Sequence, residues 1–375
     1  MANGGVTGVA LDNVSIFRGE QMMNSRGQIP DWITYPGEQW KTISVSEAGF
    51  NSEKFDSVIE STSAKGATFA GEIHNDNEWG AVLTRGGYLV HAWGDPTYRF
   101  QTASVGKAFT RAVIGLAVKE GLISPDDLVS KTWTGEGQLS HPHKLLDQGH
   151  HKTLTWRHLI GPRDAGYHSG GFSVTNGFFW RQGSYAQGIQ IPEWSAFTGD
   201  PFCDNYSHAP PGTVECYSSG GIWRLSQALT VLWDQDIKEV LDDRLFSKIG
   251  IQARNWDWIA GRTIFENKTF YPSMPGYGDF VDPPYECNGH KVRGGGGWAI
   301  MNALDLARFG LLVATGGVWN GEQLIDSEWL RSHGGGNGSF VYASPETCIS
   351  IAVVTTKGLP PLDSFNELVD GPVCQ

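Results

Sequence analysis

A serine and a lysine three residues apart offer nucleophilic chemistry at the start of an expected helix. Ser104 and Lys107 lie in residues 100–109, and apolar residues spaced every three to four positions predict a helix over residues 104–120. Residues three apart share one helical face, so a neutral lysine amine could take the serine proton while N–H groups at the helix start hold an oxyanion. An N-cap serine followed by a surface lysine gives the same spacing, and because S-x-x-K is frequent by chance, the pair alone favours this structural interpretation.

Two later stretches add residues that suit the same chemistry. Tyr217 follows a Pro-Gly pair in residues 211–221, and His333 opens a glycine-rich stretch at residues 333–341. With S-x-x-K first, the tyrosine motif second and the glycine-rich stretch last, the chain resembles the serine β-lactamase and penicillin-binding-protein superfamily, for which S-x-x-K is an established signature. More narrowly, it resembles the branch that holds the β-lactamase-like (family VIII) esterases and 6-aminohexanoate-dimer hydrolase.

The segments that flank these motifs support the same resemblance. Residues 154–160 are similar to a Leu-Thr-x-Arg-His segment of the family, and residues 297–310 are similar to its glycine-rich segment followed by Asp-Leu-Ala-Arg-Phe-Gly. The resemblance covers roughly residues 40–356. It implies an α/β (α+β) fold, β-lactamase/transpeptidase-like, in which an antiparallel sheet is flanked by helices and carries an inserted, mostly helical domain.

The resemblance also implies a role for each central residue. Ser104 would be the acyl-accepting nucleophile, Lys107 would assist its deprotonation, and Tyr217 would pass a proton to the leaving group. Because an ordinary tyrosine has a pKa of about 10, Tyr217 needs a nearby cation, for which Lys107 is the candidate. The oxyanion hole would consist of the backbone N–H groups of Ser104 and Gly336, and no cofactor or metal is implied.

The chain departs from the family pattern at two positions that bear on substrate choice. His333 replaces the lysine of the K-T-G motif, and Ser219 replaces the asparagine of the tyrosine motif. Together with Gly334 and Gly335, these residues are expected to line the substrate site, although a polar residue next to a run of glycines would explain His333 equally well. Both changes occur in esterase-like and amide-hydrolase members, and a counterpart of the class A glutamate is absent. A small ester or uncharged amide is therefore favoured over penicillins.

Three functions remain compatible with these residues. The first is a serine hydrolase that works through an acyl-enzyme, and the second is an acyltransferase that passes the acyl group to a small-molecule acceptor. The third, an inactive binding protein, is disfavoured because all three motif centres are intact. The His-Gly-Gly-Gly sequence at residues 333–336 also resembles the oxyanion motif of α/β-hydrolases, but it falls late in the chain and no G-x-S-x-G follows it.

Composition limits the partners that the protein can have. The chain has 375 residues, of which 40% are hydrophobic and 18% charged, which is typical of one large domain or two closely packed ones. A net charge of −12 without a basic stripe argues against nucleic acid and anionic membranes, and no apolar run approaches membrane-spanning length. The expected partner is a small-molecule ester, amide or thioester. The oligomeric state is not indicated.

Histidines, cysteines and sequons give weaker signals. Four histidines between residues 141 and 151 are interpreted as polar loop residues, because no carboxylate or thiolate ligands accompany them. The five cysteines have no C-x-x-C spacing, which argues against zinc, and Cys203 and Cys216 are a candidate pair. N-x-S/T sequons hint at secretion, but the first residues are not a signal peptide, so an intracellular protein and a secreted one without its leader are both open. The sequons begin at Asn13, Asn205, Asn267 and Asn337.

Hydrophobic periodicity and turn residues predict the arrangement of elements. We expect an irregular arm over residues 1–40, a sheet domain over 41–100 and 291–375, and a mostly helical insertion over 101–290, with the active site at their junction. Helices are expected over 52–63, 218–233, 236–248, 304–314 and 363–369, and another after an N-cap at Ser124. Strands are expected over 79–84, 88–93, 338–343 and 348–355.

Overall fold

A computed structural model describes most of the sheet and helices that surround the candidate site. The described residues are 29, 31–61, 79–132, 153–160, 167–169, 215–260, 286–335, 338–354, 366 and 368–369. Within them, only the backbone is described at residues 58–61, 159–160, 167–169, 215–221 and 223–224.

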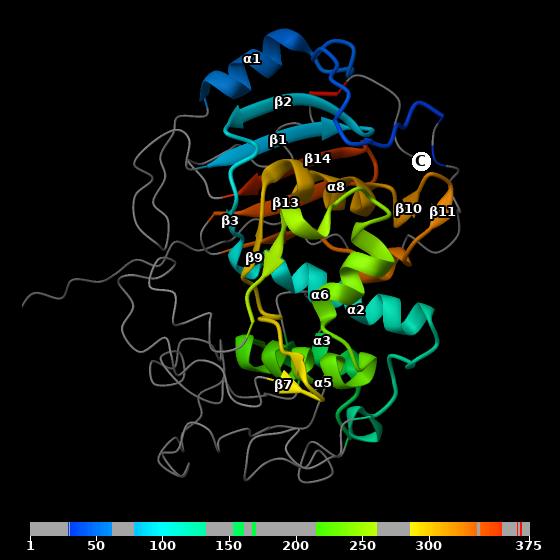
Figure 1. Cartoon of the computed structure of the whole chain (residues 1–375). Coiled ribbons are helices and arrows are strands. Elements are labelled where there is room, and N and C mark those ends of the chain that lie inside the picture. The colour runs from blue at the N-terminus through cyan, green and yellow to red at the C-terminus, as the bar shows by residue number, and fades with distance from the viewer. Residues whose placement is uncertain are drawn as a thin grey trace, which may run out of the picture.

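Strands from both halves of the sequence form one five-stranded antiparallel sheet (Figure 1). Its order is β12-β13-β14-β1-β2, so β1 pairs with β14 although more than 250 residues separate them. The short strand β12 forms one edge. The bounds are β1 (Gly80–Arg85), β2 (Tyr88–Gly94), β12 (His333–Gly334), β13 (Phe340–Ser344) and β14 (Ile349–Val354).

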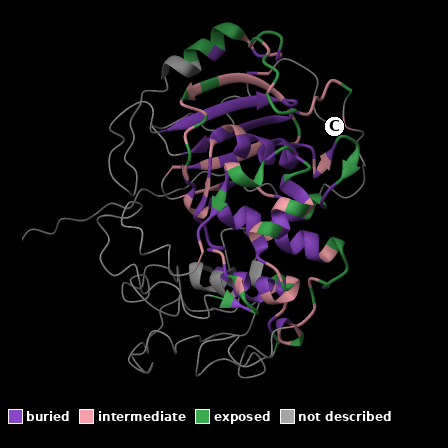
Figure 2. Ribbon diagram, viewed as in Figure 1, coloured by how far each residue is buried: buried purple, intermediate pink, exposed green. Residues whose placement is uncertain are grey.

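Both faces of the central strands are covered, and Figure 2 shows β1 and β14 as buried. Side chains alternate between the two faces of a strand. Val82 belongs to the core that includes α8 (Ala303–Ala314), whereas Leu83 belongs to the core that includes Phe55 of α1 (Ser52–Ser61). Burial on both faces explains why β1 and β14 are almost continuously apolar.

A second sheet and the central helix α2 connect the main sheet to the remaining helices. Phe109 of α2 is fully buried, and its ring lies 5.1 Å from that of Phe309 on α8 and 6.2 Å from that of Trp258. Helix α2 also packs against α5 and α6. The helices are α2 (Gly106–Lys119), α5 (Ser219–Trp233) and α6 (Ile237–Leu241). The second sheet has the order β3-β9-β6, with the bounds β3 (Phe100–Gln101), β9 (Ala299–Met301) and β6 (Asp257–Trp258).

Short elements complete the described part of the chain. The small helical segments are η1 (Ala103–Val105), η2 (Val129–Lys131), α3 (Trp156–Ile160), the π-helical η5 (Asp242–Phe246), η6 (Ala253–Asn255) and η8 (Ser327–Trp329). The paired short strands are β4 (Tyr167–Ser169) with β5 (Glu215–Ser218), β7 (Glu286–Cys287) with β8 (His290–Lys291), and β10 (Val318–Trp319) with β11 (Glu322–Gln323).

Most expected elements are confirmed, with one clear error at Ser124. The expected hairpin, the helix over 218–233 and the last two strands agree with β1, β2, α5, β13 and β14 to within two or three residues. After Ser124 the chain forms a turn instead of a helix. The Asp127 carboxylate accepts from the Ser124 backbone N–H (2.7 Å), and the Asp127 N–H donates to the Ser124 carbonyl (3.0 Å). A side chain that bonds the local backbone in this way competes with helix formation.

Other expected features are only partly described. The helix over 236–248 continues from α6 into the π-helical η5, and the end of the expected helix over 363–369 instead has Val369 in an isolated bridge with Phe50. The histidines at 141–151 lie outside the described residues. Cys348 is disulfide-bonded, to a cysteine whose side chain is not described, and the pairing of Cys203 with Cys216 and the domain boundaries stay predictions.

Two features are absent from the described ranges of the chain. None of the helices in those ranges is both long and apolar enough to cross a membrane. The same ranges contain no group of three or more His, Cys, Asp and Glu side chains that could hold a metal ion.

Candidate active site

A sharp backbone turn at Ala103 brings the chain from β3 into the segment that carries Ser104. Ala103 has a φ of 48°, in the left-handed region that costs a residue with a side chain about 1 kcal/mol or more. The surrounding strands hold the turn in place. The Thr102 N–H donates to the Ala299 carbonyl (2.8 Å), and the Trp298 N–H donates to the Ala103 carbonyl (3.0 Å). Such strain in a well-bonded turn is typical of functional sites.

Ser104 and Lys107 meet directly at the start of α2. The Lys107 Nζ lies 3.0 Å from the Ser104 Oγ and also donates to the Gly296 carbonyl. Lys107 is only 3% exposed, and the N-cap of α2 is Val105, so the interpretation as an N-cap serine with a surface lysine is wrong. The Oγ–Nζ distance is within the range for direct proton transfer.

The glycine-rich edge strand lies beside the nucleophile turn. Strand β12 contacts η1, which contains Ser104, although 229 positions separate Ser104 from His333. Two backbone hydrogen bonds hold the turn that follows β12. The Gly335 N–H donates to the Ser339 carbonyl (2.7 Å), and the Gly338 N–H donates to the Gly335 carbonyl (3.0 Å). Gly336, the expected second oxyanion donor, lies outside the described residues, so its role stays a prediction.

His333 is the first residue of the edge strand β12, and its side chain is buried. It pairs with Val341 of β13, and directly paired residues point to the same face of a sheet, so His333 points toward the core that contains α2 and α8. Its Nδ1 lies 2.8 Å from the Gly334 carbonyl oxygen, which only accepts, so Nδ1 carries a proton. Gly334 faces the other side, where a Cβ would lie 2.9 Å from the Tyr342 hydroxyl oxygen.

The expected tyrosine is placed only through its backbone. Tyr217 is on β5, which leads directly into α5, and α5 packs against α2. Ser219 is the first residue of α5. The side chains of both residues are not described, so the structure brings Ser104, Lys107 and β12 together and leaves the contacts of Tyr217 and Ser219 as predictions.

Sequence reasoning missed the segment that lies behind the catalytic pair. Residues 294–297 are four consecutive glycines, and the sequence motifs assigned no site role to them. Gly296 accepts from Lys107, and a Cβ on Gly297 would lie 2.4 Å from the Ala103 carbonyl oxygen. Consecutive glycines are a signal of close backbone approach, and this signal could have identified the segment.

The family model Beta-lactamase matches residues 79–369, which include Ser104, Lys107, Tyr217 and β12. The chain belongs to the beta-lactamase family. The resemblance inferred from the motifs is thus confirmed, and so is the expected fold class. Membership in this family indicates serine hydrolase chemistry.

Two solved structures share the fold at low sequence identity. A candidate beta-lactamase from Bacteroides dorei is 14% identical with a TM-score of 0.54, and the match covers 86% of this chain and 100% of that one. A candidate 6-aminohexanoate-dimer hydrolase from Bacillus anthracis is 14% identical with a TM-score of 0.50, and the match covers 91% and 88%. No curated protein sequence matches this chain. At these identities the neighbours support the fold alone.

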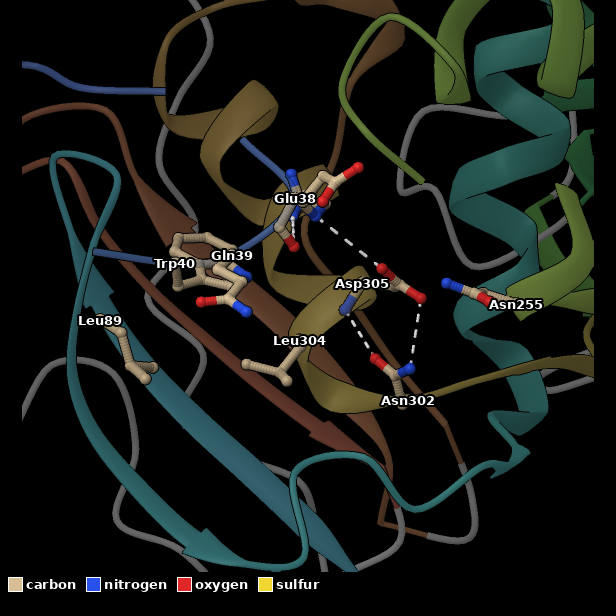
Figure 3. A pocket seen from close by; sticks show the side chains of 9 residues that line it. Glu38, Gln39, Trp40, Leu89, Asn255, Asn302, Leu304 and Asp305 are labelled. Atoms are coloured by element: carbon tan, nitrogen blue, oxygen red, sulfur yellow. Dashed lines mark hydrogen bonds and ion pairs between the residues drawn. The ribbon is translucent and has the colours of Figure 1, made fainter. Parts of the chain in front are cut away.

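A pocket between the N-terminal segment, β2 and the start of α8 is separate from the serine (Figure 3). The Arg308 Nε lies 3.8 Å from the Asp305 carboxylate, and the Arg308 guanidinium donates to the carbonyls of Pro36 (3.0 Å) and Gly37 (2.6 Å). Burial raises the pKa of Asp305 and lowers the pKa of Arg308, and each charge partly offsets the shift of the other. These contacts anchor the N-terminal segment to α8, so we interpret the pair as structural.

Proposed function

We propose that this chain is a serine hydrolase that cleaves a small ester or amide through an acyl-enzyme on Ser104. The single observation that carries the proposal is the 3.0 Å contact between the Ser104 Oγ and the amine of the buried Lys107. A serine hydroxyl is a weak nucleophile unless an adjacent group takes its proton. The beta-lactamase-family match supports this chemistry.

The proposed reaction has two stages that share one set of groups. The Ser104 Oγ attacks the substrate carbonyl carbon while its proton passes to the Lys107 amine, and the oxyanion is held by the N–H groups of Ser104 and Gly336. Collapse of this intermediate breaks the ester or amide bond, and the leaving group takes a proton through Tyr217. Water then attacks the acyl carbon and gives up a proton to the same groups. The bond between this carbon and the Ser104 Oγ breaks, the Oγ takes the proton back, and the acid is released. Each oxyanion donor in such sites is worth about 3 kcal/mol in the transition state.

The substrate is proposed to be small and uncharged near the scissile bond. His333 occupies the position of the K-T-G lysine and is held against the Gly334 carbonyl, so a permanent positive charge is missing there. Carboxylates gain most from a fixed cation with good geometry. The protein as a whole, at a net charge of −12, offers no long-range attraction to an anion.

The test is covalent labelling of the wild-type protein and of a Ser104→Ala variant with a fluorophosphonate, followed by peptide mass spectrometry. We expect the added mass on the Ser104 peptide and loss of p-nitrophenyl butyrate hydrolysis in the variant. Labelling at another residue, or full activity in the variant, would overturn the proposal. Addition of small alcohols during turnover distinguishes hydrolysis from acyl transfer, because an acyltransferase would form the new ester in preference to the acid.

A further inference from the structure

Five successive backbone carbonyls next to the catalytic pair each accept a hydrogen bond from a side chain. These carbonyls belong to residues 293–297, and the donors come from α2, α5 and β6. The Ser226 hydroxyl donates to Arg293 (2.6 Å), the Trp258 indole to Gly294 (3.1 Å) and Gly297 (2.7 Å), the Thr110 hydroxyl to Gly295 (2.7 Å), and the Lys107 amine to Gly296. An irregular segment rarely has every carbonyl bonded in this way, since about two-thirds of protein hydrogen bonds join backbone groups to each other.

The segment is in direct contact with the turn that holds Ser104. A Cβ on Gly297 would lie 2.4 Å from the Ala103 carbonyl oxygen, and a Cβ on Gly106 would lie 2.7 Å from the Gly297 carbonyl oxygen. Real Cβ atoms do not approach oxygen so closely, so glycine is required on both sides of this contact. Any shift of residues 294–297 is therefore transmitted to the backbone on either side of Ser104.

Trp258 is placed to hold both ends of the glycine segment. Its indole nitrogen bonds the first and last of the four glycine carbonyls, and its backbone pairs with Ala299 of β9, beside β3 (Figure 1). The side chain is fully buried, with its ring 6.2 Å from that of Phe109 on α2. Because one rigid ring bonds Gly294 and Gly297, the Gly296 carbonyl between them has little freedom to move.

Thr110 holds the same segment from the helix that carries the lysine. It lies three residues after Lys107, on the same face of α2, and is fully buried. Its hydroxyl bonds the Gly295 carbonyl at 2.7 Å, next to the carbonyl that accepts from Lys107. The lysine and the threonine thus bond adjacent carbonyls of one segment.

We propose that Trp258 and Thr110 are positioning residues for the catalytic pair. They fix the Gly296 carbonyl so that it takes one N–H of the Lys107 amine and turns the lone pair of the neutral amine toward the Ser104 Oγ. This inference rests on the function proposed above. It predicts that removing either donor slows attack by the serine without altering how substrate is bound, since a misplacement of about 1 Å can cost about 100-fold in rate.

A matched pair of tryptophan variants tests the inference. Trp258→Phe keeps the ring and removes the N–H, while Trp256→Phe makes the same change two residues away, where the indole donates to the Asp242 carboxylate (2.7 Å). Both tryptophans are nearly fully buried and both pack near Phe109. The readouts are the second-order rate constant for fluorophosphonate labelling of Ser104, the kcat and KM for p-nitrophenyl butyrate, and the melting temperature.

We expect Trp258→Phe to lower the labelling rate and kcat by about 10- to 100-fold with KM within about 2-fold of wild type. Trp256→Phe is expected to lower the melting temperature but keep the labelling rate. Equal labelling rates in wild type and a folded Trp258→Phe variant would overturn the inference. So would an equal loss of labelling in both variants, because a general packing defect would then explain the effect.

Thr110 supplies a second test that does not depend on the folding of the tryptophan variant. Thr110→Val removes the hydroxyl at nearly constant volume, and Thr110→Ser keeps it. We expect slow labelling in the valine variant and recovery in the serine variant, whereas equal rates in the two would overturn the inference. A wild-type protein that is not labelled at Ser104 would instead overturn the proposed function, so the two failures are distinguishable.

Discussion

Gly297 packs directly against Ala103, and a Cβ on the glycine would lie 2.4 Å from the Ala103 carbonyl oxygen. We therefore expect Gly297→Ala to destabilise the protein by about 1–3 kcal/mol, the usual cost of forcing an extra carbon into a packed site. The same change should abolish most esterase activity, because Ala103 is the turn residue that places Ser104. Urea unfolding and p-nitrophenyl butyrate hydrolysis measure the two effects.

Gly37→Ala is the control for this substitution. A Cβ on Gly37 meets nothing within 4 Å, and its backbone carbonyl still accepts from Arg308. Surface changes of this kind usually alter stability by less than about 0.5 kcal/mol. If Gly297→Ala were as mild as Gly37→Ala, the close contact behind the nucleophile would be wrong.

Lys107 and Tyr217 are expected to behave as one unit with Ser104. Lys107→Met and Tyr217→Phe should each lower kcat by about 100- to 10,000-fold, the range for loss of a general base or acid. The double variant should be little slower than either single variant, because members of one catalytic unit are not additive. Steady-state kinetics of the three variants measure this directly, and losses that multiply would indicate independent roles.

Lys119→Met is the matched control for the lysine. Lys119 is on the same helix, α2, but its amine donates to the carbonyls of Gln323 (2.7 Å) and Leu324 (2.9 Å), away from Ser104. We expect this variant to keep wild-type kcat and KM within about 2-fold. A loss of activity as large as that of Lys107→Met would mean that α2 responds to any lost lysine contact.

The parts of the fold that were predictable are those whose signal is local. The apolar stripe that follows Ser104 predicted α2, and the two stretches that flank the turn residues 85–87 predicted β1 and β2. The expected helix after Ser124 failed because the Asp127 carboxylate bonds the local backbone, which hydrophobic periodicity does not report.

In the candidate site, too, the features with a local sequence signal were predictable and the non-local ones were not. The S-x-x-K spacing is local and placed Ser104 and Lys107 together correctly. The support behind them is not local, because the donors Thr110, Ser226 and Trp258 bond carbonyls that are 36 to 185 positions away in the sequence. Pairing of a donor with one particular distant carbonyl is set by tertiary packing, and a single sequence contains no period or spacing that reports it.

Substrate preference depends on the charge at position 333. We expect the wild-type protein to have a higher kcat/KM for p-nitrophenyl butyrate than for nitrocefin. Nitrocefin has a carboxylate, and position 333 provides no fixed cation to bind it. His333→Lys should raise the ratio of nitrocefin to ester turnover by about 10-fold, consistent with about 1.4 kcal/mol from a charge-assisted contact. His333→Gln, which is neutral, is the control and should not raise that ratio.

A wild-type preference for nitrocefin would contradict this prediction and require another cation. Arg293 does not supply it in this structure, because its guanidinium bonds the Asp236 carboxylate at 2.9 Å through Nε and 2.6 Å through Nη2. Arg163 is a second arginine that could serve, and it lies outside the described residues. An Arg163→Ala variant would then be the next measurement.

Acid stability should depend on His91, which lies on β2, an edge strand of the main sheet. Its ring is 4.5 Å from that of Trp93 and 5.9 Å from that of Phe55, and burial lowers its pKa below 6.5, with a smaller opposing effect from Asp56. Because the unfolded chain binds this proton more readily than the folded one, the free energy of unfolding decreases as the pH falls through 6.5 toward the lower folded pKa.

His91→Phe keeps an aromatic ring that does not titrate. We therefore expect the melting temperature of the variant to fall less than that of wild type between about pH 7.5 and pH 5.5, a window that brackets the reference histidine pKa. Burial lowers the pKa of His158 as well, so some dependence on pH should remain in the variant. Equal losses of melting temperature in the two proteins would mean that the His91 imidazole is as accessible to protons in the folded state as in the unfolded chain.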